Sequence, residues 1–249
     1  MGIKIKKVTF DQNVLDLVCG VNGNEYEQTG ACLREYILKG KIHGFVPDSF
    51  FPIENLQRDE KYKVLSEFMR GKNGANYEMS IFASQRLEKI KELNIRALVG
   101  TRIFDWSPGA HCFFHDFLDA APFSLNIINR TNEVAEKLWS VGLGRAQIVE
   151  LGNNLNKMAF PENDRPRHWT EGFNCNTVDW KHVVSALGEW IDADLVSSHV
   201  GYENDYLCTR DFGSNSGSKS TLHPVNRDWL SKEYNIKFVT PVELIKILE

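Results

Sequence analysis

Short apolar runs alternate with amphipathic segments at both ends of the chain, and this alternation strongly constrains the fold. Near the N-terminus, residues 3–10 predict a strand, because isoleucine and valine recur among lysines. Near the C-terminus, residues 237–240 predict a strand, and residues 241–248 predict a helix that opens with a proline. Strands that alternate with helices predict an α/β fold, here a three-layer α/β/α sandwich with a central, mostly parallel sheet.

The composition is that of an ordinary globular protein, with 249 residues, 42% of them hydrophobic and 25% charged. A formal net charge of −4 argues against a chain that coats nucleic acid indiscriminately. No apolar run approaches the roughly 20 residues that a membrane span needs, and the N-terminal segment lacks the apolar core of a secretory signal. We therefore expect a cytoplasmic protein without a membrane partner.

Aspartates follow two of the predicted strands. Asp11 closes the strand over residues 3–10, and Asp211 follows an apolar strand over residues 206–209 after one arginine. Because ligands of parallel sheets collect beyond the carboxyl ends of the strands, we expect these two carboxylates to share one site.

Two further carboxylates stand near the starts of predicted helices. Glu54 lies in a helix predicted to start at Asp48 or Ser49 and to run to about Met69, and Asp179 lies at the start of a helix predicted over residues 178–191. Singly, each acid is explained as a cap or a surface residue. Together, they would repel one another until a divalent cation neutralised them.

Oxygen ligands are those that Mg²⁺ and Mn²⁺ prefer. A bound ion of this kind activates water and stabilises charge on phosphate oxygens. The sequence therefore predicts a metal site of Asp11, Glu54, Asp179 and Asp211 that hydrolyses phosphodiesters.

The order and context of these acids resemble the PIN-domain family, in the motifs at residues 8–15, 52–54, 179–186 and 205–212 and in the closing strand and helix at 235–245. PIN domains are typically metal-dependent ribonucleases, and many are the toxins of toxin–antitoxin pairs. The resemblance implies that Asp11, Asp179 and Asp211 hold Mg²⁺ or Mn²⁺ and that Glu54 completes the acidic cluster. It also implies that Asn13 and Thr209 orient the ligands or the attacking water.

We therefore expect an endoribonuclease that uses water as its nucleophile and RNA as its substrate, with an antitoxin-like protein inhibitor or a second copy of the chain as a further partner. Arg210 or Lys219 would hold the scissile phosphate.

The resemblance covers residues 1–70 and 177–249. The middle region, residues 73–176, is longer than the family needs, so we expect a single domain over residues 1–249 with an insertion there. Within it, residues 152–176 are rich in Asn, Pro and Arg and predict a loop.

Two other functions fit the same residues. In a phosphatase of another α/β fold, Asp11 would be the nucleophile, although Gln12 and Asn13 stand where an Asp-x-Asp signature needs its second aspartate. The chain would otherwise be a non-catalytic module that binds RNA or protein on a PIN-like scaffold.

Overall fold

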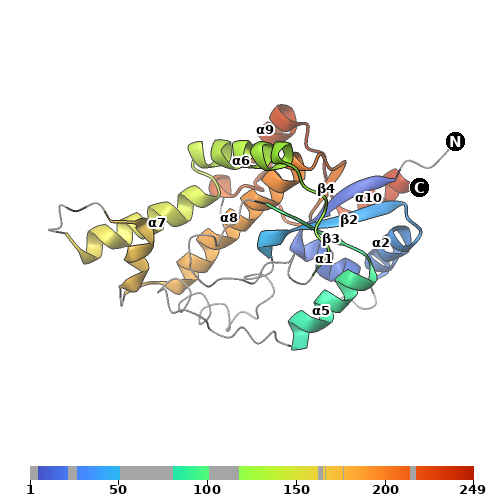
Figure 1. Cartoon of the computed structure of the whole chain (residues 1–249), viewed down its shortest axis with the longest axis horizontal. Helices are drawn as coiled ribbons and strands as arrows, with labels where there is room; N and C mark the ends of the chain where they lie inside the picture. Colours follow the sequence, from blue (N-terminus) through green and yellow to red (C-terminus); the bar gives the residue numbers. More distant parts are fainter. Residues whose placement is uncertain are drawn as a thin grey trace.

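The computed structural model describes residues 5–21, 27–50, 81–100, 118–161, 165, 167–175, 177–213 and 217–249. In this part of the chain five strands form one sheet in the order β3-β2-β1-β4-β5 (Figure 1), and neighbouring strands pair in parallel. The strands are β1 (Lys6–Phe10), β2 (Ile42–Pro47), β3 (Arg96–Leu98), β4 (Tyr206–Cys208) and β5 (Phe238–Val239). The predicted α/β architecture with a parallel sheet is confirmed.

Strand β1 lies at the centre of the sheet, between β2 and β4. Its residues Thr9 and Phe10 pair with Leu207 and Cys208 of β4. The backbone N–H of Asp11 then donates to the carbonyl of Cys208 at 3.0 Å. The carboxyl ends of β1 and β4 are therefore level, and the residues that follow them meet at one edge of the sheet.

One face of the sheet is covered by α1 (Gln12–Cys19), α2 (Gln28–Leu38), α5 (Ile81–Glu92) and α10 (Pro241–Leu248). Their apolar faces bury Leu15, Leu33, Leu87 and Leu244 against the strands. The predicted last helix is present with its expected start. Its cap, Thr240, accepts from the N–H of Glu243, whose carboxylate accepts from the N–H of Thr240 at 2.7 Å.

The opposite face is covered by α6 (Leu125–Ser140), α8 (Trp180–Gly201) and α9 (Pro224–Tyr234). Leu138, Val196 and Leu230 from these helices share a buried core with Leu207 of β4. Among the described helices, none has both the length and the apolar character needed to cross a membrane.

A buried polar contact joins α8 to the middle strand. A hydrogen bond of 3.0 Å connects Thr9 Oγ1 and His199 Nδ1, and the side chain of Asn204 donates to Thr9 Oγ1 at 2.8 Å. Burial lowers the pKa of His199 to about 3, against a small opposing effect from the charge of Asp205. The imidazole is therefore neutral in the folded protein at ordinary pH.

A second core lies away from the sheet. Helix α7 (Arg145–Ala159), the 3₁₀ helix η3 (Trp169–Asn174) and the first half of α8 pack together and project beyond the sheet as one arm, here called the α7–α8 arm. Its buried side chains are Ile148, Leu155, Trp169, Phe173, Val183, Leu187, Trp190 and Ile191.

The predicted loop over residues 152–176 is wrong, because α7 runs to Ala159 and η3 begins at Trp169. The apolar residues of this stretch are few, but Leu155 and Phe173 are buried in the core of the arm. Their burial outweighs the turn-favouring Asn residues around them.

The predicted helix boundaries also change in α8. The helix begins at Trp180, after a cap by Asp179 in place of the expected Thr177, and it continues to Gly201 instead of ending at residue 191. Residues 51–80, with most of the helix predicted from residue 48 to 69, lie outside the described residues.

Backbone-to-backbone packing in the arm leaves no space for a side chain at Gly152. A Cβ added there would overlap the carbonyl oxygen of Trp169. We expect Gly152→Ala to lower the free energy of unfolding by about 1–3 kcal/mol. Gly188→Ala, in the open part of α8, should instead raise it by about 0.5–1 kcal/mol through helix propensity. Urea unfolding of both variants checks this, and an equal effect of the two substitutions would contradict the packing.

Protonation of His199 should destabilise the fold in acid. Burial lowers its pKa from 6.5 to about 3, so between these values the unfolded chain binds a proton that the folded protein does not. The free energy of unfolding is therefore unaffected by His199 above pH 6.5 and decreases as the pH falls from 6.5 toward 3. The expected slope is about 1 kcal/mol per pH unit in that window. We expect His199→Gln to remove this part of the slope in urea unfolding measured between pH 7 and pH 4.

The control is His43→Gln, because His43 is exposed on β2. Its slope should match that of the unmodified protein. A slope that His199→Gln leaves unchanged would show that His199 is not kept neutral by the fold.

Candidate functional site

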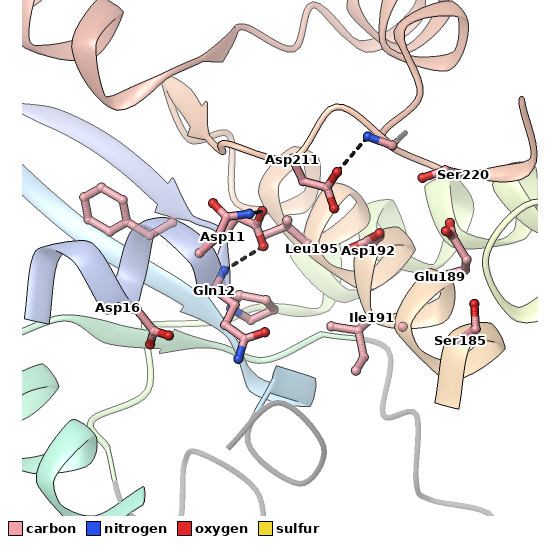
Figure 2. Close-up of a pocket in the computed structure, with 15 residues that line it drawn as sticks. Asp11, Gln12, Asp16, Ser185, Glu189, Ile191, Asp192, Leu195, Asp211 and Ser220 are labelled. Carbon is pink, nitrogen blue, oxygen red and sulfur yellow. Dashed lines mark hydrogen bonds between the residues drawn. The ribbon is translucent and has the colours of Figure 1, made fainter. Parts of the chain in front are cut away.

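A cleft of about 370 Å³ opens at the carboxyl edge of the sheet. Asp11 enters it from the end of β1, Asp211 from the segment after β4, and Asp192 from α8 (Figure 2). Glu189 and Ser185 come earlier on α8 and lie farther from Asp11 than Asp192 does in the same view. The fold therefore brings Asp11 to the same cleft as two carboxylates from the last quarter of the sequence.

Asp11 is held by hydrogen bonds to both of its carboxylate oxygens. Oδ1 accepts from the backbone N–H of Gln12 at 2.6 Å, which also makes Asp11 the cap of α1. Oδ2 accepts from Thr209 Oγ1 at 2.6 Å and from the side-chain amide of Asn13 at 2.7 Å. The structure thus places both predicted supporting residues against Asp11.

Thr209 also connects Asp11 to Asp211. Its hydroxyl oxygen accepts from the backbone N–H of Asp211 at 2.9 Å while the hydroxyl donates to Asp11. Asp211 Oδ1 in turn accepts from the N–H of Gly213 at 2.7 Å. One threonine side chain therefore joins the carboxylate of Asp11 to the backbone of Asp211.

Helix α8 contributes two carboxylates that the sequence analysis did not select. Glu189 is buried and accepts from the backbone N–H of Thr221 at 3.0 Å, so it holds the segment after the 3₁₀ helix η4 (Gly217–Lys219) against α8. Asp192 lies almost one turn later on the same face, partly exposed in the cleft. Of the two, Asp192 is the better placed to meet a ligand.

Asp179 does not line the cleft. It caps α8 by accepting from the N–H of Lys181 at 2.9 Å, and its other oxygen lies 3.1 Å from His182 Nδ1. Its side chain is 58% exposed. It precedes Asp192 by about three and a half helical turns, roughly 20 Å along the axis.

The other predicted site residues are placed as follows. The exposed Arg210 side chain lies 3.7 Å from Glu27 Oε2, and its backbone N–H donates to Asn13 Oδ1 at 2.9 Å. Lys219 is exposed at the end of η4, next to Ser220 of the cleft, and its carbonyl accepts from Gln147. Glu54 lies outside the described residues.

Arg227 of α9 is a further charged neighbour of the cleft. Burial lowers its pKa, while the charges of Asp211, Asp11 and Asp192 act to raise it. These are the same carboxylates that line the cleft. The guanidinium, which is not itself a lining residue, therefore offsets part of their mutual repulsion.

At the other end of the cleft, Asp16 of α1 is engaged with Arg86. Arg86 Nη2 lies 2.7 Å from Asp16 Oδ1, and the arginine side chain is only 1% exposed. Breaking such a buried pair is costly, so Asp16 serves the packing of α1 against α5 more than a ligand.

The carboxylates of the cleft bear on whether a divalent cation could bind there. Among the described residues, no group of three or more His, Cys, Asp or Glu side chains is arranged to hold a metal ion. Asp11, Asp192 and Asp211 nevertheless supply oxygen ligands, and Mg²⁺ usually keeps several waters and takes only one or two carboxylates together with substrate phosphate. The donor chemistry fits an ion bound partly through water.

The geometry of an antiparallel helix could have narrowed the search on α8 to Asp192 and Asp194. Helix α8 precedes β4, and the strand runs back alongside the helix in the opposite direction. Three strand residues rise about 10 Å, which a helix covers in about seven residues. The helix residues level with the end of β4 are therefore near Asp192 and Asp194, far from Asp179.

Comparison with protein-family models, with curated proteins and with solved structures found no match for this chain. The resemblance to PIN domains therefore stays a prediction from the sequence motifs.

Removal of the bridging hydroxyl should loosen the carboxylate of Asp11 and the backbone of Asp211. Thr209→Val keeps the shape of the side chain but leaves Asp11 Oδ2 and the N–H of Asp211 without this partner. We expect the free energy of unfolding to fall by about 1–3 kcal/mol. Thr209→Ser, which retains the hydroxyl, should recover most of the loss in the same chemical-denaturation measurement; recovery by Val and not by Ser would rule out the bridge.

Proposed function

We propose that this chain is a metal-dependent endoribonuclease that hydrolyses RNA in the cleft beside Asp11, Asp192 and Asp211. The observation that supports it is the convergence of these carboxylates at the carboxyl edge of a parallel sheet, the edge at which ligands of such sheets bind. Asp192 takes the role that the sequence analysis gave to Asp179.

The three carboxylates differ in burial and hydrogen bonding, and we assign their roles from these differences. Asp11 is only 9% exposed and has both oxygens hydrogen-bonded, so it offers a rigid ligand. Asp192 and Asp211 are partly exposed and complete the acidic wall from the other elements. A bound Mg²⁺ or Mn²⁺ supplies an activated water and stabilises charge on the phosphate.

Water is a better nucleophile for this site than Asp11 itself. A phosphatase mechanism through a phospho-aspartate needs a carboxylate oxygen that is free to attack. Asp11 Oδ1 accepts from the N–H of Gln12, and Oδ2 accepts from Asn13 and Thr209, at 2.6 to 2.7 Å. Donated hydrogen bonds draw electron density from both oxygens and reduce the nucleophilicity of the carboxylate, which favours the ribonuclease over the phosphatase.

The acidic cleft also explains why RNA binding should depend on a cation. Asp11, Asp192 and Asp211 repel a phosphate, and Arg227 offsets only part of this charge from behind. RNA that binds without any metal ion would instead favour the non-catalytic binding module. If the chain is the ribonuclease, an antitoxin-like protein inhibitor would act by covering this cleft.

The test compares two aspartates of one helix. We expect Asp192→Asn to weaken Mn²⁺ binding by at least about tenfold and to abolish cleavage of single-stranded RNA. The matched control Asp179→Asn, outside the cleft, should change neither by more than about twofold. Isothermal titration with Mn²⁺ and a cleavage assay measure the two quantities separately.

The outcomes separate the candidate functions. Cleavage that survives both EDTA and Asp192→Asn would end the metal-nuclease proposal. Loss of Mn²⁺ binding in Asp179→Asn alone would restore the ligand expected from the sequence motifs. A phosphoenzyme trapped on Asp11 would establish the phosphatase, and RNA binding without cleavage would establish the binding module.

A further inference from the structure

An exposed aromatic ring is carried by the residue between two residues that line the cleft. Phe212 lies between Asp211 and Gly213, which both line the cleft, and it is 52% exposed. A large apolar side chain in such a position forgoes the stabilisation that burial would give. The contacts of Phe212 indicate a role for this exposed ring.

The ring is supported by a cation on one side. The guanidinium carbon of Arg227 lies 4.9 Å from the centre of the Phe212 ring and 5.1 Å from that of Phe238. Arg227 Nε donates to the carbonyl of Leu222 at 2.8 Å, which fixes the guanidinium. Phe212 is thus the exposed member of a stack that begins in β5.

The backbone on both sides of the ring is also fixed. The N–H of Asp211 donates to Thr209 Oγ1, and the N–H of Gly213 donates to Asp211 Oδ1. Gly213 has φ of +60°, and a Cβ there would overlap the backbone of His223. The ring is therefore held in place before any ligand arrives, which lowers the entropic cost of binding.

A flat, rigid and exposed ring beside a phosphate-cleaving site suits one kind of ligand group. Nucleobases stack on aromatic side chains, whereas the bases of a duplex are already stacked on one another. We propose that Phe212 is the stacking platform for a nucleobase of single-stranded RNA, which sets that nucleotide's phosphate beside Asp211. This inference rests on the proposed ribonuclease function and names its substrate class.

Stacking can be measured directly with 2-aminopurine, a base whose fluorescence falls when it stacks. The probe is a short single-stranded RNA that contains 2-aminopurine, and it is titrated with protein in the presence of Mn²⁺. The protein carries Asp192→Asn so that cleavage does not interfere. Its concentration is raised until the weakened binding site is saturated. We expect Phe212→Ala to weaken binding about tenfold and to remove the quenching, while Phe212→Trp retains both. Duplex RNA of the same sequence should bind with equal affinity to the protein with Phe212 and to the Phe212→Ala variant.

Two controls separate stacking from packing. Phe212→Leu keeps an apolar side chain but no flat ring, so it should behave like Phe212→Ala if the ring stacks on a base. Phe123→Ala removes a ring that is 57% exposed and lies just before α6, and it should change nothing. Binding and quenching that Phe212→Leu leaves intact would overturn the inference, as would the failure of this RNA to bind.

The proposal and the ribonuclease function fail in different ways. If the unsubstituted protein cleaves RNA and Phe212→Ala cleaves it with unchanged KM, the function stands and the stacking platform falls. If RNA stacks on Phe212 but is never cleaved, the platform stands as part of a binding module and the ribonuclease falls.

Discussion

The pairing of β1 with β4 is the constraint on which the cleft depends. Phe10 and Cys208 are level in the sheet, so the chain leaves both strands at the same height. The next residues, Asp11 and Thr209, are then close enough to share a hydrogen bond of 2.6 Å. A shift of this pairing by one residue would turn Thr209 to the other face of the sheet and separate it from Asp11.

Helix α8 serves both cores of the protein. Its second half packs on the sheet with α6 and α9, and its first half belongs to the α7–α8 arm. The face that carries Ser185, Glu189 and Asp192 lines the cleft. A single rigid helix therefore positions the wall of the cleft with respect to the sheet, and the arm braces that helix from its far end.

The sequence predicted the parts of this structure that depend on local signals. The strand before Asp11, the strand before Asp211 and the last helix over residues 241–248 are all present, since each has a clear apolar pattern and a cap or a proline. The pairing of Asp11 and Asp211 in one cleft followed from the rule on parallel strands. Asn13 and Thr209 also lie beside Asp11, as the motifs implied.

The sequence did not predict features that depend on tertiary packing. Asp192 lies inside α8 among buried residues, and nothing local distinguishes it from Asp194 two positions later. Asp179 has the stronger local pattern because it caps the helix, and that pattern is explained fully by its bond to the N–H of Lys181. In the same way, the arm is stabilised by Trp169 and Phe173 packing on Trp190 and Trp180, contacts that no window of sequence reveals.

The bond between Thr209 and Asp11 joins residues separated by 198 positions. A contact of this range can form only after the segment that follows β4 is made, and the entropy of closing so large a loop makes its formation slow. The growing chain therefore presents β1 and Asp11 long before the strand that completes the cleft exists. The two halves of the cleft therefore cannot act together until β4 has joined the sheet beside β1.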